Sequence, residues 1–461
     1  MLSGVFVAWY YNESTWPLVI SSLITGITGG MIWIVLGKRN KKGIAKREGY
    51  LIVALSWVVV SLFGALPYIF SNSIPSFTNA FFETISGFTT TGATILTDIE
   101  SVPKNILFWR AMTQWLGGMG IIVLTVAILP FLGIGGMQLL IAEMPGITPD
   151  KLHPRITATA KRLWGIYVLF TLLETIILWV GEMDFFDAVC HSFATMATGG
   201  FSTKNDSIAG FSPFTQYVII AFMILAGTNF TLHYLALHTK FKRLWYNQEF
   251  KVYMSIIVVI TTLVTIGLVL YNLNDSIESS FRDAFFTVVS ILTTTGFVTT
   301  DYLLWPTSVW IMIFTLMFIG GSAGSTGGGI KISRHLLLVK NSWAELKRAI
   351  HPQAVIPVKF NGKSVSQQII FNVMAFFLLY IMIFTTGVVV MASIGMDFET
   401  SIGSVAATLG NIGPGIGSVG PVENYALFSP FAKWFLSFLM LLGRLELFTV
   451  LIVISPAFWR S

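Results

Sequence analysis

A short apolar segment that closes on a glycine turn occurs four times along this chain. The four turns are uncharged and each contains a glycine, and they cover Thr89–Ala93, Met196–Gly200, Thr293–Phe297 and Gly410–Pro414. A single Thr-Gly pair is common in loops, so one copy would carry little information. Four copies at near-equal spacing, each behind a short apolar segment, predict a fourfold structural repeat.

The composition places these turns in a membrane protein. Hydrophobic residues make up 54% of the 461 residues and charged residues only 11%, against about 25% charged in ordinary soluble domains. A helix that crosses a bilayer needs about 20 apolar residues. Uncharged runs of about that length or more cover 14–37, 49–82, 111–142, 207–239, 252–274, 302–330 and 364–396. We therefore expect an all-α polytopic membrane protein.

The basic residues predict the topology. The net charge of +6 comes from loops between apolar runs, which fits membrane orientation better than nucleic-acid binding. The basic loops cover 38–47, 151–162, 240–251 and 331–363. Positive residues favour the cytoplasmic side, so the four glycine turns are expected outside. Cys190 is the single cysteine, which leaves no internal disulfide.

Each repeat is expected to run from an outer helix through a short re-entrant helix and an extended turn to an inner helix. Non-helical backbone at membrane depth is tolerated where it is buried or lines a wet cavity, so four such turns predict one pore. The expected limits are a leading helix with its basic loop in 1–48, then repeats in 49–149, 150–247, 248–357 and 358–461.

The short helices are expected to point their C-terminal ends at the pore, where their partial negative charge favours a cation. Glycine suits the turns because it adopts positive φ at little cost. Rings of backbone carbonyls built in this way replace the hydration shell of potassium. The acids Glu83, Asp187, Asp283 and Glu399 precede the turns. Helix capping is the preferred interpretation of these acids, and direct ion binding is the alternative.

At these motifs the chain resembles the Trk/Ktr/HKT superfamily of potassium transporters, in particular the TrkH-like membrane subunits of the Trk system. The matching stretches are Arg47–Tyr50, Ala80–Thr94, Gln114–Gly120, Ala197–Ser202, Thr293–Phe297, Gly320–Lys331 and Gly443–Glu446. The likeness runs from about residue 17 to the end. TrkH-like proteins usually have two helices before the first repeat, whereas one leading span is visible here, which predicts an external N-terminus.

The resemblance implies potassium uptake across a bacterial cytoplasmic membrane. By matching position it implies a potassium-binding filter at Thr90, Thr91, Gly92, Ala197, Thr198, Gly199, Thr294, Thr295, Gly296, Asn411, Ile412 and Gly413. It also implies a homodimer and a cytosolic TrkA-like subunit that binds nucleotide. No cofactor is expected on this chain itself, and nucleotide would act only through that partner.

A glycine-dense stretch interrupts the third inner helix. It comprises Gly320, Gly321, Ser322, Ala323, Gly324, Ser325, Thr326, Gly327, Gly328 and Gly329. Glycine costs about 1 kcal/mol relative to alanine inside a helix, so the helix is expected to break here. A phosphate-binding loop is the rival interpretation, but Ile330 separates Gly329 from Lys331 where that motif needs Gly-Lys. The resemblance implies that the stretch is a gate.

Two polar residues lie in apolar surroundings. Arg444 is expected either to place a fixed charge in the pore or to bond between helices. Asn229 is expected either to line the pore or to bond between helices. An enzyme embedded in the membrane is the alternative function class, but the sequence contains no clustered catalytic set, so we expect a transporter. Proton coupling, sodium coupling and poorly selective cation conduction remain alternatives.

Overall fold

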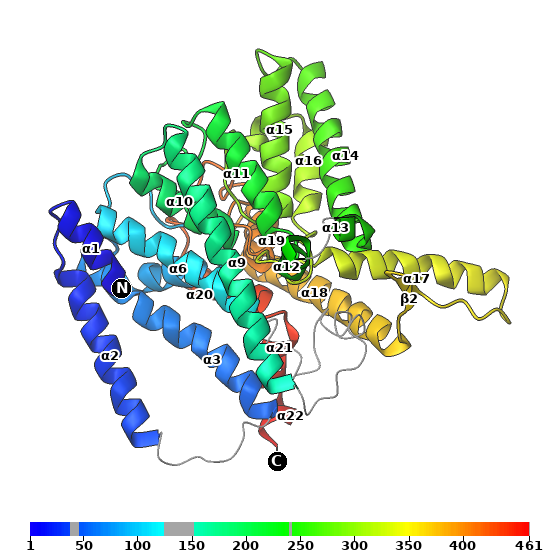
Figure 1. The fold of residues 1–461 in the computed structure, drawn as a ribbon, viewed down its shortest axis with the longest axis horizontal. Helices are drawn as coiled ribbons and strands as arrows, with labels where there is room; N and C mark the ends of the chain where they lie inside the picture. The colour runs from blue at the N-terminus through cyan, green and yellow to red at the C-terminus, as the bar shows by residue number, and fades with distance from the viewer. Residues whose placement is uncertain (37–45, 124–151, 239–241, 461) are drawn as a thin grey trace.

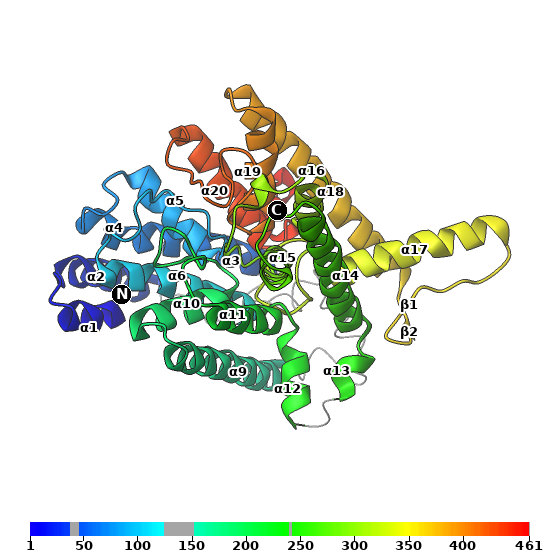
Figure 2. The same ribbon diagram turned by 90° about the horizontal axis from the view of Figure 1, so that it is seen from above.

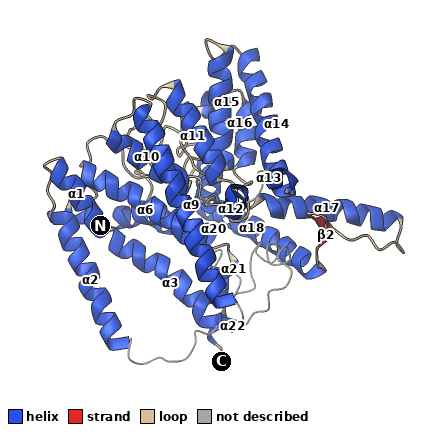
Figure 3. Cartoon of the chain, in the orientation of Figure 1, coloured by secondary structure: helices blue, strands red, loops and turns tan. Residues whose placement is uncertain are grey.

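The computed structural model describes residues 1–36, 46–123, 152–238 and 242–460. Much of the first basic loop and the end of the predicted first repeat lie outside these residues. The described chain is almost entirely helical, and its one small sheet is a hairpin of β1 (Lys359–Phe360) and β2 (Lys363–Ser364) (Figure 3).

A long helix stands at the start of the chain and at the start of each predicted repeat. After α1 (Leu2–Tyr10), which is too short to cross a bilayer, these helices are α2 (Trp16–Leu36), α3 (Lys46–Gly64) with α4 (Leu66–Phe70), α9 (Leu152–Val180), α14 (Gln248–Leu270) and α18 (Gln367–Ser393). Five segments within them are long and apolar enough to span a membrane. The prediction of a polytopic helical protein with one leading span is therefore confirmed for the described residues.

Four short helices each end at one of the glycine turns. They are α5 (Phe77–Phe88), α10 (Phe185–Ala197), α15 (Ile277–Leu292) and α19 (Phe398–Gly410). Their C-terminal halves are buried on every side, as in Ala80 to Phe88 of α5. A helix that is buried all round lies inside a bundle rather than on its surface.

The inner helices follow the turns. They are α6 (Lys104–Val123), α11 (Pro213–Ala226) with α12 (Phe230–His238), α16 (Thr307–Leu316) and α20 (Pro430–Arg444). Ser212 and Ser429 cap α11 and α20, and each is followed by a proline at the first helical position. Serine is favoured at the cap because its side-chain oxygen accepts a hydrogen bond from an unpaired backbone amide of the first turn. Proline is favoured at the next position because it has no amide hydrogen that would be left unpaired there. The remaining elements are α13 (Lys242–Tyr246), the 3₁₀ helix η3 (Tyr302–Leu304), α17 (Ile332–Ile350), α21 (Phe448–Ile454) and α22 (Pro456–Trp459).

The elements follow one another around a centre. Seen from above, the colours pass around the molecule in sequence order from blue to red (Figure 2). α10 packs against α6, α15 against α11, and α5 against α20, so the first and last parts of the chain meet. In each of these pairs a short helix contacts the inner helix that precedes it in the ring. α17 projects away from this body (Figure 1).

Candidate ion pathway

The four turns have the same backbone conformation. In each turn two residues with positive φ flank a middle residue, and the pairs are Thr90 and Gly92, Thr198 and Gly200, Thr294 and Gly296, and Asn411 and Gly413. In all four turns the amide of the middle residue donates to a carbonyl five residues earlier, at 2.8 to 2.9 Å. Four equivalent turns, each at the end of a buried helix, are what the sequence pattern predicted.

The register of the second turn differs from the predicted one. The sequence pattern predicts this filter segment at Ala197–Gly199, but Ala197 is the last residue of α10. The positive φ values belong to Thr198 and Gly200, so the equivalent segment is Thr198–Gly200. Thr198 is followed by two glycines, so a glycine is available in either register, and the end of the helix determines which one is used.

The turns form a closed ring. A Cβ atom built on Gly92 would lie 2.2 Å from the carbonyl oxygen of Gly199, in the next turn. The same contact recurs from Gly200 to the oxygen of Thr295 at 2.2 Å, from Gly296 to that of Ile412 at 1.9 Å, and from Gly413 to that of Thr91 at 2.7 Å. Each glycine therefore makes room for a carbonyl of the following turn, and the fourth glycine makes room for one in the first.

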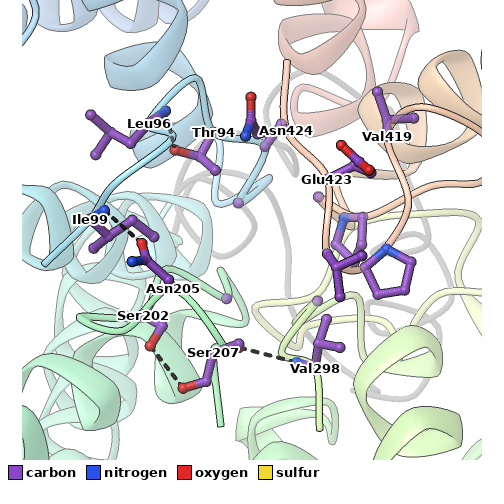
Figure 4. Close-up of a pocket in the computed structure, with 18 of the residues that line it drawn as sticks. Thr94, Leu96, Ile99, Ser202, Asn205, Ser207, Val298, Val419, Glu423 and Asn424 are labelled. Carbon is purple, nitrogen blue, oxygen red and sulfur yellow. Dashed lines mark hydrogen bonds between the residues drawn. The ribbon is translucent and has the colours of Figure 1, made fainter. Parts of the chain in front are cut away.

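The four positive-φ glycines also line one cavity of about 170 Å³ (Figure 4). The loops around it contribute polar groups, among them Asn205, Ser207 and Glu423. The Ser207 Oγ accepts from the amide of Val298 at 3.2 Å and so joins the second and third loops. The cavity therefore lies between these loops and the ring.

Side chains brace the ring unevenly. The hydroxyls of Thr89 and Thr91 lie 2.8 Å apart, and those of Thr293 and Thr295 repeat this pair in the third turn. In the fourth turn, Asn411 donates to the Thr91 hydroxyl and so ties this turn to the first, at 2.9 Å. The fourth segment, Asn411–Gly413, has no threonine and is therefore held differently from the first and third.

Two of the four acids, Asp187 and Glu399, lie in the first turns of α10 and α19, where the helix dipole favours a negative charge. The capping bonds of these two helices come from Asp184 and Asp397 instead. The capping interpretation is also wrong for Glu83 and Asp283, which lie inside α5 and α15. Glu83 is fully buried and forms an ion pair with Arg110 at 2.7 Å, which anchors the first short helix to α6.

The glycine-dense stretch breaks the third inner helix, as predicted, between α16 and α17. Its residues contact the ends of three short helices. The amide of Gly328 donates to the Thr294 hydroxyl at 2.6 Å, and the Thr326 hydroxyl donates to the Met196 carbonyl at 3.1 Å. A Cβ on Gly328 would lie 2.4 Å from the Gly410 carbonyl oxygen. The stretch therefore lies against the underside of the ring.

A second break holds this stretch in place, and the sequence analysis did not predict it. α11 and α12 meet at 98°, at Gly227 to Asn229. The carbonyl of Gly227 accepts from the Ser322 amide at 2.9 Å, and the Phe230 amide donates to Gly324 at 3.1 Å. Asn229 accepts from the amide of Thr231, so it stabilises the start of α12. Gly227 and the polar Asn229 are the sequence signals for the break.

Glu249 ties the glycine-dense stretch to α17. This buried residue lies in the first turn of α14. One carboxylate oxygen accepts from the Ala323 amide at 2.7 Å and from the Ser333 amide at 3.1 Å. One side chain thus bridges the start of the loop to the start of α17.

Arg444 links three segments below the ring. Its guanidinium donates to the carbonyl of Thr326 at 2.7 Å and to that of Gly117 at 3.1 Å. The side chain is buried, and Glu446 is paired with Arg334 instead, at 2.5 Å. Bonding between helices, one of the two predicted roles, is therefore present, and the charge lies beside the glycine-dense stretch.

Comparison with known proteins identifies the family. The TrkH family model, described as a cation transport protein, matches residues 18–461. This chain belongs to the TrkH family. It is 44% identical to the Trk system potassium uptake protein TrkH of Salmonella typhimurium, over all of this chain and 96% of that protein. It is 46% identical to TrkH of Escherichia coli K12, over 94% of this chain and 90% of that protein.

A solved structure agrees with this assignment. The crystal structure of the potassium transporter TrkH from Vibrio parahaemolyticus superposes with a TM-score of 0.90 at 39% identity, covering 100% of this chain and 96% of that one. The TrkH family consists of cation transporters, so the prediction that this chain is a membrane transporter and not an enzyme is confirmed. In the described part of the chain, His, Cys, Asp and Glu form no cluster that could hold a metal ion.

Proposed function

We propose that this chain carries potassium into a bacterial cell through the ring formed by its four turns. The observation that carries this proposal is the closed series of contacts in which each turn glycine faces a carbonyl of the next turn. Relatives of 44% and 46% identity are named potassium uptake proteins, which supports potassium as the substrate.

The ring can coordinate a potassium ion with oxygen atoms, as water does. Carbonyl oxygens of the turns replace the hydration shell of an ion that enters from the cavity above. The C-terminal ends of four buried helices add partial negative charge at the same place. We assign the filter to Thr90–Gly92, Thr198–Gly200, Thr294–Gly296 and Asn411–Gly413, with the second segment in its corrected register.

The glycine-dense stretch is the gate in this proposal. It lies against the ends of the short helices, so an ion that leaves the ring inward meets it next. Arg444 donates a hydrogen bond to the Thr326 carbonyl of this stretch. The positive charge of Arg444 opposes the passage of cations. Movement of this stretch away from the ring would open the pathway.

We place the turns outside and α17 in the cytoplasm of a bacterium, in its inner membrane, with repeats at the predicted limits. The last turn of α17 contains Lys347 and Arg348, which fits the cytoplasmic side. Trp343, Leu346 and Ile350 on this projecting helix are 58% to 72% exposed, which supports contact with a second copy of the chain or with a regulatory protein. A homodimer with a TrkA-like nucleotide-binding subunit fits relatives named as parts of a Trk system. The chain itself would need no cofactor.

Growth of a bacterium that lacks its own potassium uptake systems tests the function. Expression of this chain, with its cognate cytosolic subunit where one is needed, should restore growth on limiting potassium. Growth with and without sodium separates potassium uptake from sodium-coupled uptake. Failure to restore growth despite confirmed membrane insertion, alone and with that subunit, would contradict the proposal.

A further inference from the structure

The second turn lacks a side chain that the other three turns have. Thr91, Thr295 and Ile412 are the middle residues of their turns, whereas the equivalent residue of the second turn is Gly199. Gly199 does not have a positive φ, so the backbone itself does not require glycine there. Another group must fill the space behind this turn.

That group is Gln114, on α6 of the preceding repeat. A Cβ atom on Gly199 would lie 2.4 Å from the amide carbon of the Gln114 side chain. The Gln114 side chain is fully buried. Its position is therefore the position that a larger residue at 199 would take.

Gln114 holds the second turn on both sides of Gly200. Its Nε2 donates to the carbonyl of Gly199 at 2.6 Å, and its Oε1 accepts from the amide of Phe201 at 3.0 Å. The two bonds use both ends of the side-chain amide, so they also determine its orientation. The Gly199 oxygen is the one that faces Gly92 in the ring.

We infer that Gln114 is a specificity-determining positioning residue of the filter, which supplies from α6 the support that the second turn lacks. In the first and third turns, paired threonine hydroxyls occupy this place. In the second turn the equivalent residues are Ala197 and Gly199, and neither has a hydroxyl. This inference rests on the proposed potassium filter and identifies what holds one of its four carbonyls.

Replacement of Gln114 should change ion discrimination more than it changes folding. Q114L keeps a side chain of similar size but loses both hydrogen bonds. We expect its potassium-to-sodium flux ratio in proteoliposomes to fall about tenfold, the scale of one buried hydrogen bond. Q114E keeps the acceptor for Phe201, places an acceptor against the Gly199 carbonyl, and should lower the ratio as well.

A double substitution that moves the side chain from position 114 to position 199 distinguishes support of the filter from general helix packing. G199T alone should fail, because its Cβ meets Gln114. The double variant Q114A/G199T removes that contact and places a side chain on the turn itself. We expect it to recover most of the selectivity that Q114A loses, which loss of helix packing would not predict.

Q216L is the matched control. Gln216 is also a buried glutamine that donates to backbone carbonyls, those of Ile208 and Phe211, but it does not contact the ring. Q216L should keep the wild-type flux ratio at equal amounts of folded protein. An unchanged ratio in Q114L, or an equal loss in Q216L, would overturn the inference. Absence of potassium flux in the wild-type protein, reconstituted with its cognate subunit where one is needed, would instead overturn the proposed function.

Discussion

At the scale of single residues, the glycines of the ring are constrained twice. Each of the four has a positive φ, which penalises a side chain, and each faces a backbone carbonyl at the distance of a clash. Gly296 is the most crowded, with 1.9 Å between its ideal Cβ and the Ile412 oxygen. A side chain there must displace a carbonyl of the next turn.

We therefore expect G296S to lose selectivity while the protein still inserts. The backbone strain alone is worth about 1–2 kcal/mol, which corresponds to a potassium-to-sodium ratio about tenfold lower. Gly362 is the control, because its φ of 81° matches the 82° of Gly296 and no atom lies within 4 Å of its ideal Cβ. G362S should keep the wild-type ratio in liposome flux, and equal behaviour of the two variants would remove Gly296 from the filter.

Arg444 should limit the flux of ions. R444A removes a positive charge and the bond to Thr326, so we expect flux per folded protein to rise roughly tenfold, for a barrier lowered by about 1.4 kcal/mol. K433A is the control, because Lys433 is a buried cation on the same helix that bonds Asn79 and the Ala426 carbonyl instead. A folded R444A protein with unchanged or slower flux would show that Arg444 is only a structural link.

At the scale of elements, the glycine-dense stretch closely approaches the ends of the short helices. Gly328 contacts both the third and the fourth turns, through Thr294 and Gly410. It does not have a positive φ, so an alanine there adds crowding without backbone strain. The stretch can adopt its position because its residues have almost no side chains.

G328A should displace the stretch from the ring and raise basal flux. Its Cβ would lie 2.4 Å from the Gly410 oxygen, a distance that real Cβ atoms do not reach. Faster hydrogen exchange of the amides in 320–329 would report the same displacement. G26A is the control, because Gly26 lies in α2 and no atom lies within 4 Å of its ideal Cβ. Unchanged flux and exchange in G328A would contradict the gate assignment.

Sequence reasoning found the elements that local patterns encode. The turns, the apolar spans and the break at Gly320–Gly329 follow from residue types within a few positions of one another. The register at Gly199 and Gly200 was missed, because it depends on where α10 ends. The sequence does not predict the support of Gly199 by Gln114 for a related reason. These two residues are far apart in sequence, and only the packing of α6 beside α10 brings them together.

At the scale of the whole molecule, the contacts of α5 with α20 close the bundle into one ring within one chain. A single chain can therefore make its four turns unequal, as Gly199 and Asn411 show. α17 stands outside this ring and exposes apolar residues.

We expect α17 to contribute to assembly. W343E should lower the dimer fraction measured by native mass spectrometry of the purified protein, because it places a charge on an exposed apolar surface. W245E is the control, since Trp245 is also an exposed tryptophan, at 55%, but belongs to a different helix, α13. A wild-type protein that is monomeric in several detergents and in nanodiscs would contradict the proposed homodimer.

The central claim is that the four turns surround one potassium ion. Anomalous diffraction from crystals grown with thallium in place of potassium locates such an ion directly. The account predicts a peak on the axis between the turns of Gly92, Gly200, Gly296 and Gly413, which weakens in G296S. No peak at the ring in a well-occupied wild-type crystal, or a main site elsewhere in the bundle, would contradict it.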